Sequence, residues 1–312
     1  MNLRRASRQL AVAASCFVAA QVMGQSKKIN VLNISTPQQL QQYFKYTGHD
    51  VPLISGHRGG PDVNAPENSL EAFEHSLQFT PAIFEIDPHL TKDSVVVLLH
   101  DDTLDRTTTG KGRLNSYTWE EAKKFKLKDV NGNLTPYRIP TLEEAIIWAK
   151  GRTVLSLDKK DVPMETTAKL IKKHHAEAWV MVTVHNAKQA KFYYENDKDI
   201  MFEAFVKTKQ ALEEYEQAGI PWQQIMAYIG PDIKPENKEL IDMLHQRGVM
   251  CMISSAPTYD KLPTVEERAK AYTAIIKSGV DVIEADRAIE AAAAVKSLAP
   301  ASSDKNKFFG KK

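Results

Sequence analysis

The chain of 312 residues is 43% hydrophobic and 26% charged, with 14 glycines, 15 prolines and two cysteines. This is the composition of an ordinary globular protein, and it excludes collagen-like, low-complexity and disordered chains. Two cysteines are too few for a disulfide framework or a cysteine-based zinc site. The formal charge of +2 excludes the strongly basic surface of a nucleic-acid-binding protein. The length allows one large domain of about 250 residues or two of ordinary size.

Residues 1–24 have the pattern of a secretory signal peptide. Three arginines within the first eight residues precede an uncharged, apolar run over residues 10–22. This run is too short to span a bilayer and suits the hydrophobic region of a signal peptide. We expect cleavage after Gly24. A lipoprotein signal at Cys16 is the alternative, because small residues precede this cysteine, although it would leave a very short hydrophobic region.

Loss of the signal peptide changes the charge of the chain. Removing its three arginines from the 41 basic residues leaves 38, against 39 acidic residues, so the mature chain carries a formal charge of −1. No later stretch reaches the roughly 18 apolar residues of a membrane span. We therefore expect an exported protein, periplasmic or secreted, without stable membrane insertion. Cys251 then stands alone in an apolar run and is expected to be a buried thiol.

From residue 51 onward, short apolar runs alternate with amphipathic runs. The preceding segment 25–50 is expected to hold a polar linker (residues 26–33) and a short helix (residues 35–46). Nine apolar runs are strand candidates: 53–55, 82–86, 95–99, 154–157, 180–184, 201–206, 225–229, 249–253 and 282–284. Eight runs are helix candidates: 69–79, 142–150, 164–175, 187–195, 209–218, 235–247, 265–278 and 288–295. Apolar strands alternating with helices indicate a parallel sheet covered on both faces, here a (β/α)8 barrel over residues 51–312.

Nine strands are one too many for such a barrel. The second and third runs, 82–86 and 95–99, are too close for the crossover helix that a parallel connection needs. We therefore expect them to form an antiparallel hairpin around the turn Thr91–Ser94. A turn centred between Lys92 and Asp93 places Glu85 opposite His100. The hairpin then returns His100 to the rim of the barrel.

The segment of residues 103–137 does not fit the alternating pattern. It is rich in Thr, Lys, Asn and Gly and is long for a loop within one domain. We expect a small insertion over the barrel mouth, a position where insertions commonly shape access to the site.

Charged residues and histidines gather where the first three barrel strands end. In a (β/α)8 barrel this is the edge that carries the reactive groups. Glu85 and Asp87 are two positions apart and so share one face of their strand. They and Asp158 follow apolar runs, and burying several like charges is costly unless a cation neutralises them. Three carboxylates suit a hard divalent cation, Ca²⁺ or Mg²⁺.

Basic residues and histidines accompany these carboxylates. Arg58 and Lys160 suit an anionic ligand that also touches the cation, and phosphate fits best. His57 and His100 can exchange protons near neutral pH as a base and an acid. Together these groups indicate metal-assisted cleavage of a phosphodiester.

The sequence resembles the glycerophosphodiester phosphodiesterase family, within the superfamily of phospholipase-C-like phosphodiesterase barrels. The match is nearly continuous from His57 to Gly112 and weaker in three later segments. The matching residues are His57-Arg58-Gly59, Ala65-Pro66-Glu67-Asn68-Ser69, Glu85-x-Asp87, Leu90-Thr91-Lys92-Asp93, His100-Asp101, Leu104-Asp105-Arg106-Thr107-Thr108, Ile139–Ala145, Asp158-Lys159-Lys160 and Asp281–Asp286. The resemblance implies a metal-dependent (β/α)8 barrel with a small insertion after its second strand.

The resemblance also implies roles for eight residues. They are a catalytic pair (His57 and His100), a phosphate-binding group (Arg58, Lys160 and Glu67) and the ligands of one divalent cation (Glu85, Asp87 and Asp158). Asn68 with Glu71 matches a helix-capping box, which is an alternative role for this asparagine.

Two departures from the family pattern concern the site. The acid of the third-strand motif is Asp158 where the family usually has Glu, so it binds the cation directly or through water. The seventh strand ends in Met252-Ile253-Ser254-Ser255 instead of a Trp-Thr-x-Asn type sequence, which removes an aromatic residue from the pocket wall. His185, at the end of the fourth strand, is either a further rim residue or a structural histidine.

The resemblance implies hydrolysis of a glycerophosphodiester to sn-glycerol 3-phosphate and an alcohol, with histidines as general acid and base. A phospholipase C- or D-like enzyme acting on intact lipids is an alternative. A barrel that only binds phosphorylated ligands is another. The polar composition of residues 103–137 favours a small substrate over a lipid. The head group and the oligomeric state are not readable from the sequence.

Overall fold

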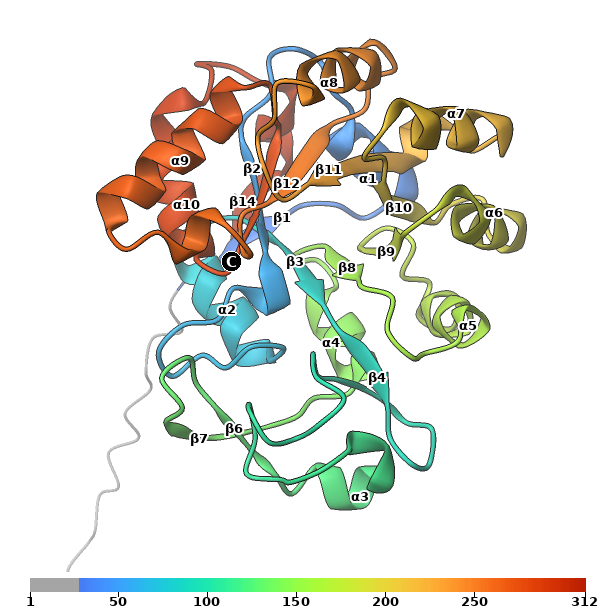
Figure 1. The fold of residues 1–312 in the computed structure, drawn as a ribbon. Coiled ribbons are helices and arrows are strands. Elements are labelled where there is room, and N and C mark those ends of the chain that lie inside the picture. Colours follow the sequence, from blue (N-terminus) through green and yellow to red (C-terminus); the bar gives the residue numbers. More distant parts are fainter. Residues whose placement is uncertain (1–27) are drawn as a thin grey trace, which may run out of the picture.

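The computed structural model describes residues 28–312, and its central feature is a closed barrel of eight parallel strands (Figure 1). In order around the barrel they are β2 (Leu53–Gly56), β3 (Ile83–Ile86), β8 (Leu155–Leu157), β9 (Val180–Val184), β10 (Met201–Phe205), β11 (Ile225–Gly230), β12 (Cys251–Ser254) and β13 (Val282–Ala285). Each coincides with a run predicted from the sequence, so the (β/α)8 fold is confirmed. The predicted signal peptide and Cys16 lie outside the described residues.

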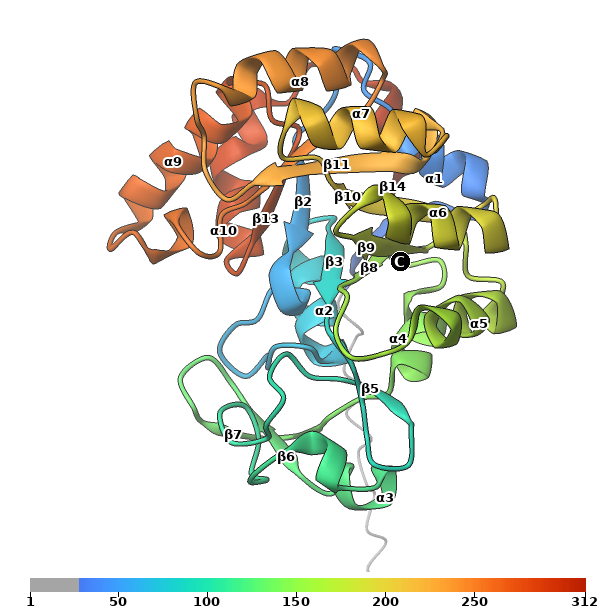
Figure 2. The same ribbon diagram turned by 45° about the vertical axis from the view of Figure 1, so that its right-hand side comes forward.

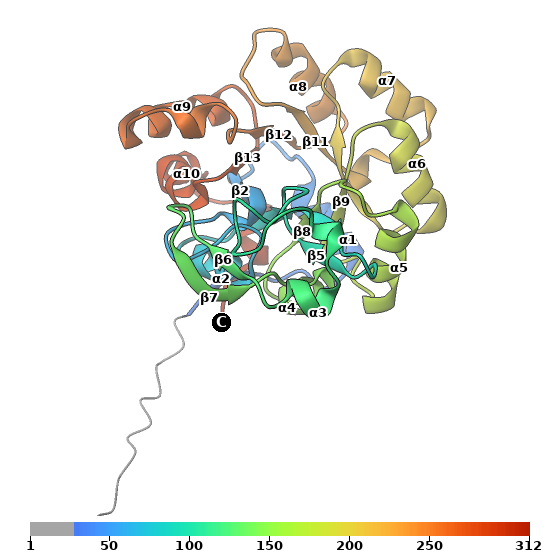
Figure 3. The same cartoon turned by 60° about the horizontal axis from the view of Figure 1, so that its bottom comes forward.

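A helix follows each barrel strand, and these helices surround the strands (Figure 3). They are α2 (Leu70–Phe79), α4 (Leu142–Ala149), α5 (Met164–His174), α6 (Ala187–Asn196), α7 (Lys209–Gln217), α8 (Asn237–Gln246), α9 (Val265–Lys277) and α10 (Ala288–Val295). Five begin after a Ser, Thr or Asn whose side chain accepts a hydrogen bond from the first helical turn, which stabilises the start of a helix. Among residues 28–312, no helix is both long and apolar enough to cross a membrane.

The N-terminal helix α1 (Pro37–Phe44) closes one end of the barrel. Its residues Leu40, Tyr43 and Phe44 are buried in a cluster with one apolar side chain from every barrel strand. The eight strand residues are Leu53, Ile83, Val154, Met181, Met201, Met226, Met252 and Val282. This cluster, which we call the floor, fills the end of the barrel opposite the carboxyl ends of the strands.

The residues around α1 include a strand that the sequence did not predict. β1 (Asn30–Leu32) pairs antiparallel with β14 (Phe309–Lys311), near the C-terminus. The segment 26–33 was expected to be a polar linker, but Val31 and Leu32 are each 1% exposed. The partner strand is almost 280 residues away, so no local pattern could indicate this pairing.

A hairpin is present, but its first strand is not the predicted run 82–86, which is the barrel strand β3. Instead β4 (Pro88–Leu90) pairs with β5 (Val96–Leu98), with His89 opposite Val97, one residue out of the predicted register. The turn contains Ser94 in the left-handed region (φ +63°), and this additional residue moves the centre of the hairpin to Asp93. The prediction that Glu85 lies opposite His100 is therefore wrong. The backbone N–H of Leu99 instead donates to the carbonyl of Asp87 (3.0 Å).

Residues 103–137 and their neighbours form a small lobe beside the hairpin, next to α4 (Figures 1 and 2). The lobe holds α3 (Trp119–Ala122) and the antiparallel pair β6 (Lys126–Lys128) and β7 (Leu134–Arg138). It has its own apolar core, made of Val97, Leu99, Leu104, Leu114, Ala122, Leu127 and Ile139. Short 3₁₀ turns occur here and elsewhere, at His57–Gly59, Leu114–Ser116, Trp222–Gln224, Tyr259–Lys261, Lys296–Leu298 and Asp304–Phe308.

Candidate active site

The site is built in two levels above the floor of the barrel. Side chains two positions apart on a strand point to the same face, so each strand places one residue in each level. Two positions after the floor residues come Ser55, Glu85, Ser156, Thr183, Glu203, Tyr228, Ser254 and Glu284, which form the middle level. Two positions further come His57, Asp87, Asp158, His185, Phe205, Gly230, Ala256 and Asp286, which form the rim. Polar chemistry is thus confined to the upper part of the barrel.

The turn after β2 brings His57 and Arg58 to the rim through an unusual backbone conformation. Arg58, Gly59 and Gly60 all have positive φ angles, of 50°, 87° and 65°. A Cβ atom on Gly59 would lie 2.3 Å from the ring of Phe73, so only glycine fits there. The turn points the backbone N–H of Arg58 at Glu85, whose Oε2 accepts it at 2.9 Å.

Glu85, Asp87 and Asp158 come together as predicted from their positions. Each offers one carboxylate oxygen, and the three atoms lie within 4.8 Å of one another. Burial, reinforced by the carboxylates of Asp87 and Glu284, raises the pKa of Glu85 well above its ordinary value. Three carboxylates in such a small space, two of them buried and that of Asp158 half-buried, need positive charge to remain ionised. This donor set fits a hard divalent cation, which prefers oxygen ligands.

Lys160 supplies part of that positive charge. Its Nζ lies 3.1 Å from Asp87 Oδ1 and 2.7 Å from Asp158 Oδ2. Burial acts to raise the pKa of Asp158, but His185 and Lys160 outweigh it and hold the pKa below its ordinary value. His185 Nε2 is 3.5 Å from Asp158 Oδ1, so this histidine reaches the edge of the carboxylate group. Lys160 therefore contacts the predicted metal ligands directly.

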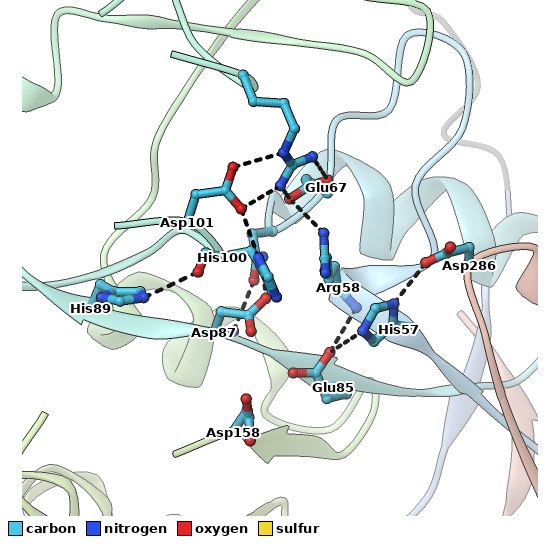
Figure 4. Close-up of polar contacts among 12 residues, drawn as sticks. His57, Arg58, Glu67, Glu85, Asp87, His89, His100, Asp101, Asp158 and Asp286 are labelled. Atoms are coloured by element: carbon cyan, nitrogen blue, oxygen red, sulfur yellow. Dashed lines mark hydrogen bonds and ion pairs between the residues drawn. The ribbon is translucent and has the colours of Figure 1, made fainter. Parts of the chain in front are cut away.

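Both predicted catalytic histidines have one ring nitrogen held by a carboxylate. His57 Nδ1 donates to Asp286 Oδ1 at 2.7 Å, and His100 Nδ1 donates to Asp101 Oδ1 at 2.8 Å. Each hydrogen bond leaves Nε2 as the nitrogen available for proton transfer. Figure 4 shows both rings beside the group of carboxylates. His57 Nε2 lies 4.0 Å from Glu85 Oε2.

The pKa of His57 is raised above its ordinary value. Burial acts to lower it, but the hydrogen bond to Asp286 and the nearby carboxylate of Glu284 outweigh burial. The pair of His57 and Asp286 joins two segments that are 229 residues apart in the chain.

Glu67 supports the site through arginines. Both of its carboxylate oxygens accept hydrogen bonds from Arg106, at 2.7 and 2.8 Å, and Oε1 lies 3.5 Å from Arg58 Nη1. Arg106 also donates to Asp101 through Nε (2.7 Å) and Nη2 (2.9 Å). A continuous chain of charged groups therefore runs from Glu67 through Arg106 and Asp101 to His100 (Figure 4).

The helix-capping role considered for Asn68 is wrong. Ser69, one position later, caps α2, with its side chain accepting from Ala72 N. Asn68 has a φ of +56°, and its amide is directed at Asp87: Nδ2 donates to Asp87 Oδ2 (2.6 Å), and Oδ1 accepts from Asp87 N (3.0 Å). Asn68 thus orients a predicted metal ligand.

Four further acidic residues of the site were not predicted from the sequence. Asp101 and Asp286 hold the histidines, and Glu203 and Glu284 lie in the middle level. Asp101 and Asp286 were within matched motifs but had no assigned role. Counting in steps of two from the floor residues would have placed Glu203 and Glu284 inside the barrel, because they interrupt apolar strands with a charge.

Comparisons with known proteins agree with this geometry. Residues 57–250 match the model of the glycerophosphoryl diester phosphodiesterase family. A crystal structure of a glycerophosphoryl diester phosphodiesterase from Parabacteroides distasonis is similar, with a TM-score of 0.90 and 60% identity; the match covers 91% of this chain and 100% of that one. A phosphodiesterase from Oleispira antarctica, in complex with the product sn-glycerol-3-phosphate, has a TM-score of 0.60 over 79% of this chain and 97% of that one. Its identity of 20% shows a shared fold alone.

Matches to curated relatives are shorter. A glycerophosphodiester phosphodiesterase of Caldanaerobacter subterraneus is 34% identical over 142 residues, which are 43% of this chain and 58% of that protein. Glycerophosphodiester phosphodiesterase 1 of Mus musculus is 41% identical over 93 residues, covering 29% of this chain and 28% of that protein. The chain thus matches well under two thirds of the length of these relatives.

Proposed function

The chain belongs to the glycerophosphoryl diester phosphodiesterase family, and from this premise we propose that it hydrolyses glycerophosphodiesters to sn-glycerol 3-phosphate and an alcohol. One observation carries the proposal: two histidines, each with Nδ1 held by a carboxylate, flank three carboxylates that lie within 4.8 Å of one another. A phosphodiester needs charge neutralisation and proton transfer on both sides of phosphorus, and this arrangement offers both.

Glu85, Asp87 and Asp158 would hold one divalent cation, Ca²⁺ or Mg²⁺. The fit rests on the buried oxygen donors and on the raised pKa of Glu85, which marks negative charge without sufficient compensation. When bound, the cation supplies positive charge that stabilises the phosphoryl oxygens as the reaction proceeds. Arg58 is positioned to neutralise the same oxygens, because its turn places it between Glu85 and Glu67.

The histidines move the protons. One imidazole accepts the proton of the attacking hydroxyl through Nε2, and the other donates a proton to the oxygen of the leaving alcohol. The new P–O bond forms to the attacking oxygen while the bond to the alcohol oxygen breaks. The attacking oxygen comes from water, or from the glycerol 2-hydroxyl through a cyclic phosphate that water then opens. Asp286 and Asp101 fix the tautomers and stabilise the imidazolium forms.

The test is an assay of purified protein with added Mg²⁺ or Ca²⁺. Glycerophosphocholine, glycerophosphoethanolamine and glycerophosphoinositol are offered separately, and sn-glycerol 3-phosphate is measured. Intact phospholipids test the rival phospholipase activity. Hydrolysis of the lipids alone, or of none of these compounds, contradicts the proposal; the latter result favours a barrel that only binds its ligand.

The signal-like pattern of residues 1–24 extends the proposal to location: we expect the protein to act after export, in the periplasm or outside the cell. N-terminal sequencing of the protein from its native envelope or medium tests this. A mature N-terminus at Gln25 supports export by cleavage after Gly24, and one at Cys16 supports the lipoprotein alternative.

A further inference from the structure

The middle level of the barrel contains two carboxylates that the proposed reaction does not use. Glu203 on β10 is 3% exposed and Glu284 on β13 is 6% exposed. Both line a cavity of ≈ 510 Å³ together with His57, Asp158 and other rim residues. They therefore lie below the reacting groups, inside the pocket that a substrate would fill.

The protein itself provides few hydrogen-bond partners for these two carboxylates. Glu203 Oε2 accepts a hydrogen bond from Ser156 Oγ at 2.7 Å, whereas Glu284 Oε2 is buried and has no hydrogen-bond partner within residues 28–312. Across that same part of the chain, neither residue forms an ion pair with a lysine or arginine. A buried carboxylate oxygen without a partner is costly, and the residue that carries it lines an open cavity.

The neighbours of both carboxylates are hydroxyl and aromatic groups. In the barrel register Glu203 lies beside Thr183, and Glu284 lies beside Ser254. Thr183, Ser254, Phe205 and Tyr228 line the same cavity. The rings of Phe205 and Tyr228 are 4.5 Å apart. Acidic and hydroxyl side chains beside aromatic faces suit a ligand with several hydroxyl groups on an apolar carbon frame.

A cationic head group is a poorer fit. Lys207 Nζ already lies over both aromatic rings, 4.3 Å from the centre of Phe205 and 4.8 Å from that of Tyr228. A quaternary ammonium would meet this like charge at the faces that would otherwise attract it. Burial, together with the charge of Glu284, also raises the pKa of Glu203 well above its ordinary value. A carboxyl group forms hydrogen bonds with hydroxyl ligands in either protonation state.

We propose that Glu203 and Glu284 bind hydroxyl groups of the substrate in the depth of the pocket and so select phosphodiesters of polyols. The inference deepens the proposed function and rests on it. The hydroxyls come from one of two sources: the glycerol itself, or an alcohol such as a cyclitol. In either case the two carboxyl groups form hydrogen bonds with the hydroxyl groups of the ligand while its phosphate is held at the rim above.

The test measures dissociation constants by isothermal titration calorimetry, with the Mg²⁺-loaded protein and two pairs of phosphate monoesters. The first pair is sn-glycerol 3-phosphate and propyl phosphate, and the second is myo-inositol 1-phosphate and cyclohexyl phosphate. Each pair differs in its hydroxyl groups, and the first probes the glycerol side while the second probes the alcohol side. The wild-type protein is expected to prefer the hydroxylated member of at least one pair about 10- to 100-fold, the range for hydrogen bonds to charged groups.

Two kinds of variant make the test specific. Glu203→Leu and Glu284→Leu should lose most of this preference, whereas Glu203→Gln and Glu284→Gln should retain part of it, because an amide still binds hydroxyls. Glu177→Gln is the matched control: the same chemical change at a half-buried glutamate that does not line the cavity. Thermal melting of every variant confirms that the comparison is between folded proteins.

The outcomes separate the two proposals. Loss of preference in the first pair identifies glycerol as the source of the hydroxyls, and loss in the second identifies the alcohol. Wild-type preference in both leucine variants overturns the inference, as does a wild-type protein without preference in either pair. Weakened binding of phosphocholine in the leucine variants, with hydroxyl preference intact, also overturns it in favour of a cationic ligand. Hydrolysis of glycerophosphocholine by the wild-type protein is measured in parallel, so that failure of the proposed function is recognised separately.

Discussion

The two sides of the barrel mouth differ sharply in chemistry. The strands β2, β3 and β8 lead directly into His57, Asp87 and Asp158, and charged groups crowd around each of them. The rim residues that belong to β10, β11 and β12 are Phe205, Gly230 and Ala256, none of which is charged. The ammonium group of the nearby Lys207 lies over the rings of Phe205 and Tyr228. The middle level shows no such division, since Glu85 lies on the first side and Glu203 on the second.

This difference separates two tasks. In the proposed function, the side formed by β2, β3 and β8 would supply charge and protons for the reaction on phosphorus, which needs groups fixed by many partners. The opposite side offers a ring pair, small residues and the unused carboxylate of Glu203, which shape a pocket without fixed ion pairs. We therefore expect substitutions on the first side to change kcat and those on the second side to change KM and substrate choice.

The largest expected effect is that of removing the cation. Exhaustive treatment with EDTA should lower hydrolysis of glycerophosphocholine on the order of 10³-fold or more, because several kcal/mol of charge stabilisation is lost. Activity should return on addition of Mg²⁺ or Ca²⁺. The Glu85→Gln variant should not regain activity at the metal concentration that restores the wild-type protein. Undiminished activity after chelation, with loss of metal checked by elemental analysis, would contradict the proposal that a cation bound by Glu85, Asp87 and Asp158 takes part in the reaction.

The histidines come next. His57→Ala and His100→Ala should each lower kcat on the order of 10²- to 10⁴-fold, because each removes a general acid or base. His75→Ala, on the outer face of α2, is the matched control and should retain activity. The assignment of acid and base catalysis to these histidines is wrong if both His57→Ala and His100→Ala keep near wild-type kcat while EDTA still abolishes activity.

Most residues on the charged side of the mouth could be predicted from the sequence. His57, Glu85, Asp87, His100 and Asp158 lie at strand ends or in motifs, and the regular barrel with its hairpin then brings them together at one end of the barrel. The spacing of residues along a strand is a local property, so these positions could be predicted. The floor, with α1 beneath eight apolar side chains, follows from the same regularity.

Other contacts depend on conformations that no local pattern specifies. The hairpin register differs from the predicted one because Ser94 adopts a left-handed conformation. Asn68 reaches Asp87 through another left-handed residue position, and Asp286 reaches His57 across 229 residues. Such pairings form only when the whole barrel closes. A sequence pattern predicts the barrel, but it does not predict which individual hydrogen bonds closure will form.

A smaller effect is expected from the aromatic wall on the second side. Phe205→Leu should raise KM for glycerophosphodiesters a few-fold and change kcat little, because loss of a partly exposed ring surface removes binding that is similar in ground and transition states. Initial rates over a range of substrate concentrations separate the two parameters. A fall in kcat comparable to that of His100→Ala would show that the division of tasks between the two sides does not hold.

The smallest expected effect is that of Asp101, on the first side of the mouth, on the free energy of unfolding. Arg106, followed by His100, lowers the pKa of Asp101, so ionised Asp101 stabilises the folded protein above its ordinary pKa of about 4 and this contribution fades as the pH falls toward the folded-state value. Because the half-buried side chain of Asp101 is still reached by solvent, which screens its charge, Asp101→Asn should cost only about 0.5–1 kcal/mol at pH 7. Urea unfolding of both proteins at pH 7, 5 and 3.5 measures the difference, which should shrink with acidification. A difference that is constant across these pH values would mean that the carboxylate charge does not contribute, and that the chain from Glu67 to His100 orients the histidine without stabilising the fold.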